Sequence, residues 1–524
     1  MNTLVPLVVL IPLFGAAGAL ILARHPRLQR LVAIIALSGI LAVGIALLVI
    51  VDSSGPLAME VGGWSAPYGI VLVVDRLSAL MLVVSAIVLL AVLLFSVGQG
   101  LADGDAETPV SIYYPTYLIL AAGVSNAFIA GDLFNLYVGF EILLVSSYVL
   151  ITLGGTEQRI RAGVTYIVVS LVSSMIFLAS IAMIYGALGT VNIADISRRM
   201  AEIPMDVQII LHVMLLIAFG IKAAVFPLSF WLPDSYPTAP APVTAVFAGL
   251  LTKVGVYSII RAETVIFPGP ELNPVLMVVA LFTMVIGVLG AVAQADIKRM
   301  LSFTLVSHIG YMILGVALGT PEGTAAATYY IVHHIVVQTT LFLAAGLIER
   351  VGGTTSINKL GGLLAVSPAV AALYFLPALN LGGIPPFSGF LGKLALFQAA
   401  AEQGGFLAWT LIGAGAFVSL LTLYALIRVW SLAFWRTNDE VDGYEFDLFT
   451  PVVDRPGTAK VKKARVIPRL MLTTTAAMVA VGVALTVFAG PLFGISERIG
   501  QNLEKSSTYV DIVFPGDSGE AIDD

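Results

Sequence analysis

The sequence predicts an all-α polytopic membrane protein with about 14 transmembrane helices, arranged as two inverted five-helix repeats with two broken helices. The first observation is composition: 59% of the 524 residues are hydrophobic and 11% are charged, whereas soluble domains carry about 25% charged residues. The second is that apolar windows of about 20 residues, the length that crosses a bilayer, recur along the chain. The third is that clustered proline and glycine residues interrupt two of these windows.

The apolar windows follow one another with short polar connections. They are centred in residues 4–23, 30–51, 76–98, 113–130, 133–153, 160–188, 208–228, 240–262, 272–293, 300–318, 322–348, 366–400, 408–434 and 467–493. The first window precedes the first cationic residue, Arg24, and a secretory signal has the opposite order. We therefore expect this window to be a retained span with the N-terminus outside. An even number of spans places the C-terminus on the same side.

The distribution of lysine and arginine predicts the orientation. With the N-terminus outside, the inner connections hold Arg24, Arg27, Arg30, Arg159, Arg161, Lys298, Arg299, Arg350, Lys359, Arg436, Lys460, Lys462, Lys463 and Arg465. The outer connections hold only Arg76, Arg198, Arg199, Arg261, Arg498 and Lys505. This asymmetry follows the positive-inside rule. It predicts a multi-pass protein of the cell membrane with both termini outside.

The windows also suggest a division of the chain. We expect a three-span segment at 1–112, a first five-helix repeat at 113–262, a second repeat at 272–435, a cytoplasmic loop at 436–466, a last span at 467–493 and a frayed acidic external tail at 496–524. Because five is an odd number, the second repeat must enter the membrane from the opposite side. The repeats are therefore expected to be inverted.

The two interrupted windows have similar amino-acid sequences. FPLSFWLPDSYPTAPAPV follows Lys222, and LGGIPPFSG precedes Lys393. Proline breaks the helical hydrogen-bond ladder and leaves free carbonyls, which a membrane tolerates only inside protein or beside water. Paired broken helices in the two halves of a transporter are typical of ion sites.

Four charged residues, Glu141, Lys222, Lys253 and Lys393, fall in the middle of apolar windows. Each charge costs about 2.5–3.5 kcal/mol at a helix centre, and such groups usually mark an ion or proton path. We expect Glu141 and Lys222 to form an ion pair, because a carboxylate favours the charged form of a buried lysine. A static buried salt bridge is the alternative for this pair. Lys253 and Lys393 have no carboxylate in their own windows, and snorkelling to an interface is their alternative.

Three histidines in the second half extend this path. His308, His333 and His334 lie within apolar windows, and a histidine between lysines suits proton relay. Adjacent helix residues point about 100° apart, so we expect only one of His333 and His334 to face the path. The alternative is a hydrogen-bonded packing histidine. His212, near the start of a window, is expected to be structural.

Other chemistries find little support in the sequence. The chain has no cysteine, no HExxH or CxxC spacing, and no evident cluster of three convergent oxygen ligands, so the sequence assigns no metal or sodium site. We expect no cofactor and, without a basic patch interleaved with aromatics, no nucleic-acid partner. Asp75 and Asp234 are expected to act as helix caps or loop anchors.

Two stretches resemble a known family. KAAVFPLSFWLPDSYPTAPAPVTAVFAGLLTKVGVY and NLGGIPPFSGFLGKLALFQAA are similar to the broken helices of the antiporter-like subunits shared by Mrp-type Na+/H+ antiporters and respiratory complex I. The resemblance extends from about the third to the thirteenth window. It implies that Glu141, Lys222, Lys253 and Lys393 form a lateral proton route with intervening waters and half-channels to each side. It also implies central polar positions at His308 and at His333 or His334.

Some features indicate which type of subunit within this family the chain resembles most. Lys393 stands where the complex I M-type subunit has glutamate, and 524 residues are too few for the A-type Mrp subunit or the complex I L-type subunit. The D-type Mrp subunits fit best, although Gln338 stands where several relatives carry lysine. The resemblance implies a hetero-oligomeric membrane complex with an A-type subunit and small subunits, exchanging protons for sodium across the lipid bilayer. The alternatives are a proton-pumping subunit of a complex I-like or hydrogenase complex, and a scaffold with vestigial charges.

Overall fold

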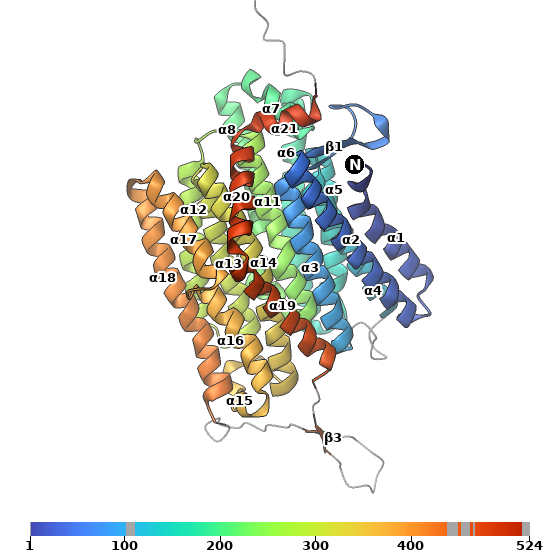
Figure 1. The fold of residues 1–524 in the computed structure, drawn as a ribbon, viewed down its shortest axis with the longest axis vertical. Helices are drawn as coiled ribbons and strands as arrows, with labels where there is room; N and C mark the ends of the chain where they lie inside the picture. The colour runs from blue at the N-terminus through green and yellow to red at the C-terminus, as the bar shows by residue number, and fades with distance from the viewer. Residues whose placement is uncertain (1, 101–109, 438–448, 452–461, 465–466, 516–524) are drawn as a thin grey trace, which may run out of the picture.

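The computed structural model of the chain describes residues 2–100, 110–437, 449–451, 462–464 and 467–515, which form a bundle of long helices along one axis (Figure 1). Among the described residues, 13 helices are long and apolar enough to cross a membrane. They coincide with thirteen of the predicted windows. The remaining window, 366–400, holds two shorter helices separated by a break. The predicted all-α polytopic class is therefore confirmed.

The N-terminal segment supplies three long helices and a hairpin. It contains η1 (Asn2–Leu4), α1 (Leu7–Ile21), α2 (Pro26–Ser54), β1 (Leu57–Glu60), η2 (Val61–Gly63), β2 (Val71–Val74) and α3 (Arg76–Gln99). The two strands pair antiparallel, with Leu57 opposite Val74. Asp75 begins α3 with a reciprocal capping box to Ser78, which satisfies backbone donors at the start of the helix. The predicted cap at Asp75 is confirmed.

Two helical units follow. The first contains α4 (Val110–Ile129), α5 (Leu133–Thr152), α6 (Glu157–Leu188), α7 (Ile193–Arg199), η3 (Met200–Glu202), α8 (Met205–Ala223), α9 (Leu232–Ser235), η4 (Tyr236–Thr238), α10 (Ala241–Val246), the π-turn η5 (Phe247–Leu251), α11 (Thr252–Arg261) and the π-turn η6 (Ala262–Ile266). The second contains α12 (Asn273–Val292), α13 (Ile297–Ala317), α14 (Pro321–Gly352), η7 (Ile357–Lys359), α15 (Leu363–Val366), α16 (Pro368–Gly382), α17 (Ser388–Gln403), α18 (Gly405–Val429) and the π-turn η8 (Trp430–Trp435).

The two units repeat the same backbone contacts with the same spacing between the contacting residues. Asp132, which caps α5, forms a β-bridge with Asn192, and Asp296, which caps α13, forms the same bridge with Ser356. Both broken helices also end alike. The amide of Val225 donates to the Gly220 carbonyl beyond α8, and the amide of Ile384 donates to the Leu379 carbonyl beyond α16. These matches support our proposal that the units are the predicted repeats, while their inversion stays a prediction.

The C-terminal segment is more ordered than the sequence suggested. After the short pair β3 (Phe449–Pro451) and β4 (Lys462–Ala464) come α19 (Arg469–Val487), α20 (Ala489–Glu504) and α21 (Ser506–Val513). The expectation of a frayed tail from residue 496 was wrong as far as Val513. Ile499 and Leu503 are buried, and Gly500 lies so close to the Pro321 carbonyl that a side chain there has no room. Most of the predicted loop at 436–466, and residues 516–524, lie outside the described residues.

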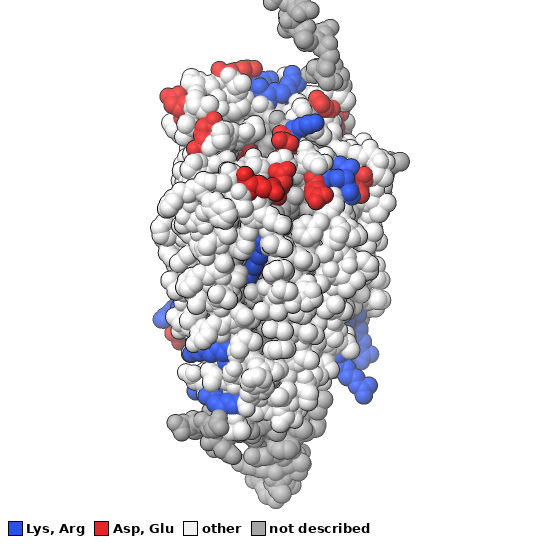
Figure 2. All heavy atoms as spheres, turned by 60° about the vertical axis from the view of Figure 1, so that its left-hand side comes forward, with Lys and Arg blue, Asp and Glu red and all other residues white. Residues whose placement is uncertain are grey.

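The two ends of the bundle differ in charge. The N-terminus and α21 lie at the same end, which we call the α21 end, and α15 lies at the opposite α15 end (Figure 1). The start of α1 and α21 therefore lie at one end, in agreement with an even number of crossings between them. Figure 2 shows acidic side chains gathered toward the α21 end, whereas lysine and arginine predominate toward the α15 end. Between them lies a broad belt almost without charge, as a lipid-facing surface requires.

Candidate ion-translocation site

The four predicted charges come from four different helices of the two units. Glu141 lies on α5, Lys222 on α8, Lys253 on α11 and Lys393 on α17. The three lysines are 8%, 0% and 3% exposed, and Glu141 is half-buried. Lysines this deeply buried need partners, because removing a charge from water costs several kcal/mol. The partners differ from one lysine to the next.

Lys222 reaches Glu141 through a third residue. The Ser174 hydroxyl, on α6, donates to Glu141 Oε1, and the Lys222 ammonium donates to Ser174 Oγ over 3.2 Å. Among the described residues no ion pair joins Glu141 directly to Lys222, so the predicted contact was wrong in this respect. The ammonium also lies 4.7 Å from the centre of the Phe140 ring, a favourable cation–π distance. Ser174 thus links the two charged groups into one hydrogen-bonded chain.

Lys253 is held by the backbone of its own helix. Its ammonium donates to the Ala248 carbonyl over 2.6 Å, and Ala248 belongs to the π-turn η5. A π-turn departs from the regular helical hydrogen-bond ladder and often marks a functional site. Gly255 packs directly against the backbone of Lys222 and Ala223, where a Cβ would clash. This close approach holds α11 against α8 beside both lysines.

Lys393 is held by the broken helix of the second unit. Its ammonium donates to the carbonyls of Leu381 and Gly382, over 3.0 and 3.4 Å, in the last turn of α16. A helix C-terminus presents free carbonyls with partial negative charge, which favour a cation. The ammonium also lies 5.2 Å from the centre of the Tyr311 ring. The predicted link between the helix break and a buried charge is confirmed here.

The histidines lie between the lysines of α11 and α17. His308 Nδ1 accepts or donates a 2.7 Å hydrogen bond with the Tyr330 hydroxyl, and its ring centre lies 5.3 Å from that of His334. His333 Nδ1 pairs with the Ser388 hydroxyl of α17 over 3.0 Å. The two adjacent histidines therefore point to different neighbours, as their helical spacing predicts. His334 faces His308, and His333 faces the helix of Lys393.

Several ring nitrogens in this region are buried without a protein partner among the described residues. Neither nitrogen of His334, nor Nε2 of His333, has a hydrogen-bond partner among the described residues, although all three are buried. Lys253 and Lys393 both lie within electrostatic range of His308 and His334. Buried polar atoms are usually satisfied by protein or by ordered water. The rings are therefore suited to bind waters between the lysines.

Sequence reasoning missed the small polar residues that connect the charges. Ser174, Tyr330 and Ser388 each bond a predicted site residue, and Asn380 holds Ser388 in place over 3.2 Å. Serine, threonine and tyrosine are common in membrane helices, so residue type alone did not single them out. The intramembrane position of Asn380, beside the glycines of the break, was the one available signal.

Three other residues from the sequence analysis have structural roles. Gln338 is buried, and its Nε2 donates to the Leu301 carbonyl of α13 over 2.7 Å. Asp234 pairs with Arg299 over 2.7 Å, as expected of a loop anchor. Asp75 also pairs with Arg261 over 2.6 Å. Burial raises the pKa of Asp75, but the Arg261 guanidinium and the hydrogen bonds from Ser78 together outweigh burial and hold the pKa below its ordinary value.

Comparison with known proteins places this arrangement in a family. The family model described as "NADH:quinone oxidoreductase/Mrp antiporter, TM" matches residues 130–422, which include Glu141, Lys222, Lys253 and Lys393. The chain is 38% identical to the D-type subunit of the Na(+)/H(+) antiporter of Alkalihalophilus pseudofirmus, over 98% of this chain and 100% of the relative. It is also 38% identical to the corresponding D-type antiporter chain of Bacillus subtilis, over 84% of this chain and 88% of the relative.

Solved structures agree with these relatives. A chain of the Mrp complex from Dietzia sp. DQ12-45-1b superposes with a TM-score of 0.88 at 34% identity, over 98% of this chain and 100% of that chain. A chain of the membrane-bound sulfane sulfur reductase, an archaeal respiratory membrane complex, gives 0.83 at 25% identity over 98% of this chain. A chain of respiratory complex I from Thermus thermophilus shares the fold, with a TM-score of 0.73. The chain therefore belongs to the NADH:quinone oxidoreductase/Mrp antiporter family of membrane subunits, and within it groups with the D-type subunits of Na+/H+ antiporters.

Proposed function

We propose that this chain is the proton-translocating subunit of a multisubunit Na+/H+ antiporter, coupled to sodium export. The observation that carries the proposal is the line of buried groups that crosses from one unit to the other. Glu141, Ser174 and Lys222 form its first part, and Lys393 ends it. Lys253, His308 and His334 lie between them. The relatives that match most of the chain are named as D-type subunits of Na(+)/H(+) antiporters.

The contacts suggest a role for each group. Lys222 and Lys393 each adjoin a helix break, where backbone carbonyls leave the helical ladder, so these lysines exchange protons with the two sides. Glu141 favours the protonated form of Lys222 through Ser174. When the carboxylate takes up a proton, Lys222 loses that stabilisation and releases its own proton. Lys253 and the histidines relay protons between the units, with waters at the unpartnered ring nitrogens.

The surroundings of the chain follow from the same proposal. The α21 end, rich in acidic side chains, faces outside, and the α15 end, rich in lysine and arginine, faces the cytoplasm, in keeping with the positive-inside rule. The membrane is the cell membrane. The chain acts as a transporter subunit with an A-type subunit and small subunits, rather than as an enzyme. The neighbour in the Mrp complex is itself part of such an assembly.

Sodium-driven proton movement in inverted membrane vesicles tests the proposal. The whole complex is expressed with Lys222→Ala in this chain, and assembly is checked by co-purification of the other subunits. We expect exchange to be lost while assembly is retained. Lys298→Ala is the matched control, because Lys298 is an equally buried lysine that pairs with Glu349 over 2.7 Å, outside the line of site residues. Normal exchange by an assembled Lys222→Ala complex would overturn the proposal.

The runner-up function is a proton-pumping subunit of a complex I-like or hydrogenase complex. The match to a chain of an archaeal respiratory membrane complex favours it. The two functions differ in their partners. Purification of the native complex would recover small Mrp-type membrane subunits under the first proposal, and iron–sulfur subunits under the second.

A further inference from the structure

A cavity of about 190 Å³ lies at the α21 end, outside the line of buried lysines. It is bounded by the end of η6, the start of α12, the turn between α13 and α14, and α20. Its lining includes the carboxylates of Glu263 and Glu504, the hydroxyls of Thr320 and Thr324, and the amide of Asn273. A cavity of this size with polar walls holds several waters. It therefore offers water a place beside Glu263.

Glu263 is the inner carboxylate of this cavity, and it has a titratable partner. Its Oε1 lies 2.6 Å from His212 Nε2, and both side chains are more than nine-tenths buried. The His212 ring is stacked on Phe267, with 4.3 Å between ring centres and 10° between ring planes, which fixes its orientation. Glu263 lies on the π-turn η6. Sequence reasoning expected a structural role for His212 and did not single out Glu263.

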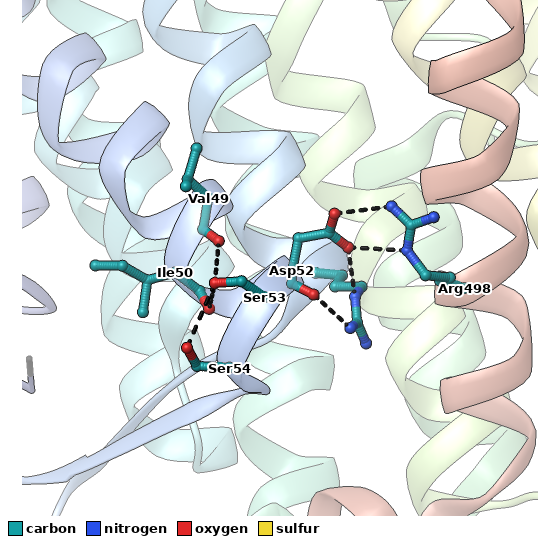
Figure 3. A network of polar contacts seen from close by, with 7 residues as sticks. Val49, Ile50, Asp52, Ser53, Ser54 and Arg498 are labelled. Carbon is teal, nitrogen blue, oxygen red and sulfur yellow. Dashed lines mark hydrogen bonds and ion pairs between the residues drawn. The ribbon is translucent and has the colours of Figure 1, made fainter.

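Three other acidic side chains toward this end of the bundle have arginine partners instead. Asp52 is held by Arg76 and Arg498 (Figure 3), with contacts of 2.8 to 2.9 Å. Asp75 is held by Arg261, and Asp195 by Arg199. Arginine keeps its charge at all physiological pH values. Histidine gains and loses a proton near neutrality. Of these pairs, only that of Glu263 and His212 can bind and release a proton in both members.

The pair also has a defined position relative to the buried lysines. His212 lies ten residues before Lys222 on α8, and Glu263 lies ten residues after Lys253 on the helix continued by η6. Ten helical residues span about 15 Å. The pair therefore joins the same two helices that carry Lys222 and Lys253, about 15 Å nearer the α21 end. An aqueous route from that end to either lysine passes this level of the bundle.

We propose that Glu263 and His212 form a proton-binding site at the inner end of a water-filled entrance on the outer face of the protein. The inference rests on the proposed function and adds an outer entry point to it. A hydronium ion in the cavity gives its proton to the pair and becomes water; the pair holds the proton between the imidazole and the carboxylate, and a second water accepts it, as hydronium, onward or back. Removing the carboxylate removes the site, even when the hydrogen bond between the helices is kept.

Each element packed against η6 carries charged or titratable side chains near the pair of Glu263 and His212. These elements are α7, α8, α11, α20 and α21. Toward this end they carry Asp195, Arg198, Arg199, Asp206, Tyr257, Arg261, Glu497, Arg498, Glu504, Tyr509 and Asp511. Arg261 and Arg199 are engaged by Asp75 and Asp195. Glu504 adds negative charge at the cavity itself, which favours arrival of a cation such as the proton.

The first experiment separates proton binding from mere fastening of α8 to η6. The whole complex carries Glu263→Gln, which keeps a hydrogen-bonding side chain beside His212 but removes the carboxylate. We expect the exchange rate near neutral pH to fall at least about a hundredfold, the lower end of the contribution of a positioned proton-transfer group. We also expect the pH of half-maximal exchange to shift. A pair that only fastens the helices predicts the wild-type rate and pH profile for Glu263→Gln, and that result would overturn the inference.

Two further variants serve as references. Asp206→Asn removes an exposed acidic residue from the first turn of α8, outside the cavity, and should leave the pH profile unchanged. Lys222→Ala tests the proposed function itself. A wild-type pH profile in Glu263→Gln together with lost exchange in Lys222→Ala refutes only the inference. Retained exchange in Lys222→Ala refutes the proposed function.

The second experiment tests whether the cavity opens to the outside. Because the chain has no cysteine, a single Thr320→Cys or Thr324→Cys substitution gives this chain one reactive thiol. A membrane-impermeant maleimide added to intact cells should label both positions in the assembled complex. Ser307→Cys, at a fully buried position, should stay unlabelled. Absence of label at both threonine positions would mean that the entrance is closed to outer water, and would overturn the inference.

Discussion

The broken helices of the two units share a backbone but hold their lysines differently. Ala224 ends α8 and Gly383 ends α16, each in the left-handed conformation, with φ of 58° and 83°. Lys222 lies two residues before Ala224, whereas Lys393 lies ten residues after Gly383. The residue that corresponds to Lys222 is Leu381, whose carbonyl accepts from Lys393. The two lysines are therefore not at equivalent positions of the two units. Nevertheless, both ammonium groups lie at the end of the first half of a broken helix.

The difference shows two ways of stabilising a buried ammonium group. In the first unit a carboxylate acts through Ser174, and its influence disappears when it is protonated. In the second unit backbone carbonyls of the break act as fixed dipoles, which do not titrate. The first lysine is thus placed to respond to the protonation of Glu141, and the second has a constant environment. The predictions below test this contrast, beginning with the largest expected effect.

Removal of the Glu141 carboxylate should affect only the buried lysine of the first unit, Lys222. We expect Glu141→Ala to reduce exchange at least about a hundredfold, the scale on which an essential proton-transfer group acts, while the complex still assembles. Sodium-driven proton movement in vesicles measures the rate. Glu263 and Glu349 remain in place in this variant. Exchange within about threefold of wild type would show that Lys222 does not depend on Glu141.

Removal of the serine link should have a smaller effect in the same direction. Ser174→Ala leaves Glu141 and Lys222 in place but removes the hydroxyl between them, at a cost of about 1–3 kcal/mol for buried groups left unsatisfied. We expect exchange to fall about tenfold. Ser180→Ala is the matched control, because Ser180 lies on the same helix and bonds only its own backbone, at Ile176. Equal rates in the two variants would contradict a linking role for Ser174.

The two helix ends should respond in opposite ways to exchange of alanine and glycine. Gly383→Ala places a Cβ 3.1 Å from the Lys393 ammonium in a left-handed residue, and should destabilise the protein by about 1–2 kcal/mol. Ala224→Gly relieves the same strain in the first unit and should be neutral or stabilising. The melting temperatures of the purified complexes give the comparison. The same sign of change in both variants would show that the two breaks are not equivalent.

The smallest effect is expected from a comparison of the aspartates that cap α5 and α13, Asp132 and Asp296. Asp296 is satisfied by Thr355, whereas Oδ2 of Asp132 has no hydrogen-bond partner among the described residues. Burial raises the pKa of Asp132 from 3.8 to about 6. Because the folded state favours the protonated acid, stability is lost as pH rises between these two values. Asp132→Asn should therefore raise the melting temperature at pH 7, with no change near pH 4. A change of equal size at both pH values would contradict this assignment.

Much of the fold could be predicted because a bilayer leaves few choices. Every backbone group must be satisfied within the segment, so apolar length alone located the helices. The window at 366–400 differs because Gly383 and two prolines divide it into α16 and α17. The region from 496 was predicted less well. α20 has polar residues on one face, and only its packing against α14 shows that the other face is buried.

The candidate site was predictable for a different reason. A charge in an apolar window is rare and costly, so the sequence itself singled out Glu141, Lys222, Lys253 and Lys393. His212 and Glu263 were not recognised as a pair, because they lie near span ends, where charged residues are common. Their significance depends on a contact between residues 51 positions apart. Ser174 was missed because its significance likewise depends on a contact with a residue far away along the chain, Glu141.

The sequence by itself determined that Glu141, Lys222, Lys253 and Lys393 lie within apolar spans and where two helices break, because hydrophobicity and proline act locally. The tertiary structure decided which group neutralises each charge. It joined Glu141 to Lys222 through a serine of a third helix. It placed the Lys393 ammonium against backbone carbonyls, and it paired Glu263 with His212 beside a cavity. Electrostatic and hydrogen-bonding interactions act over a few ångströms in space, and separation along the chain does not report such distances.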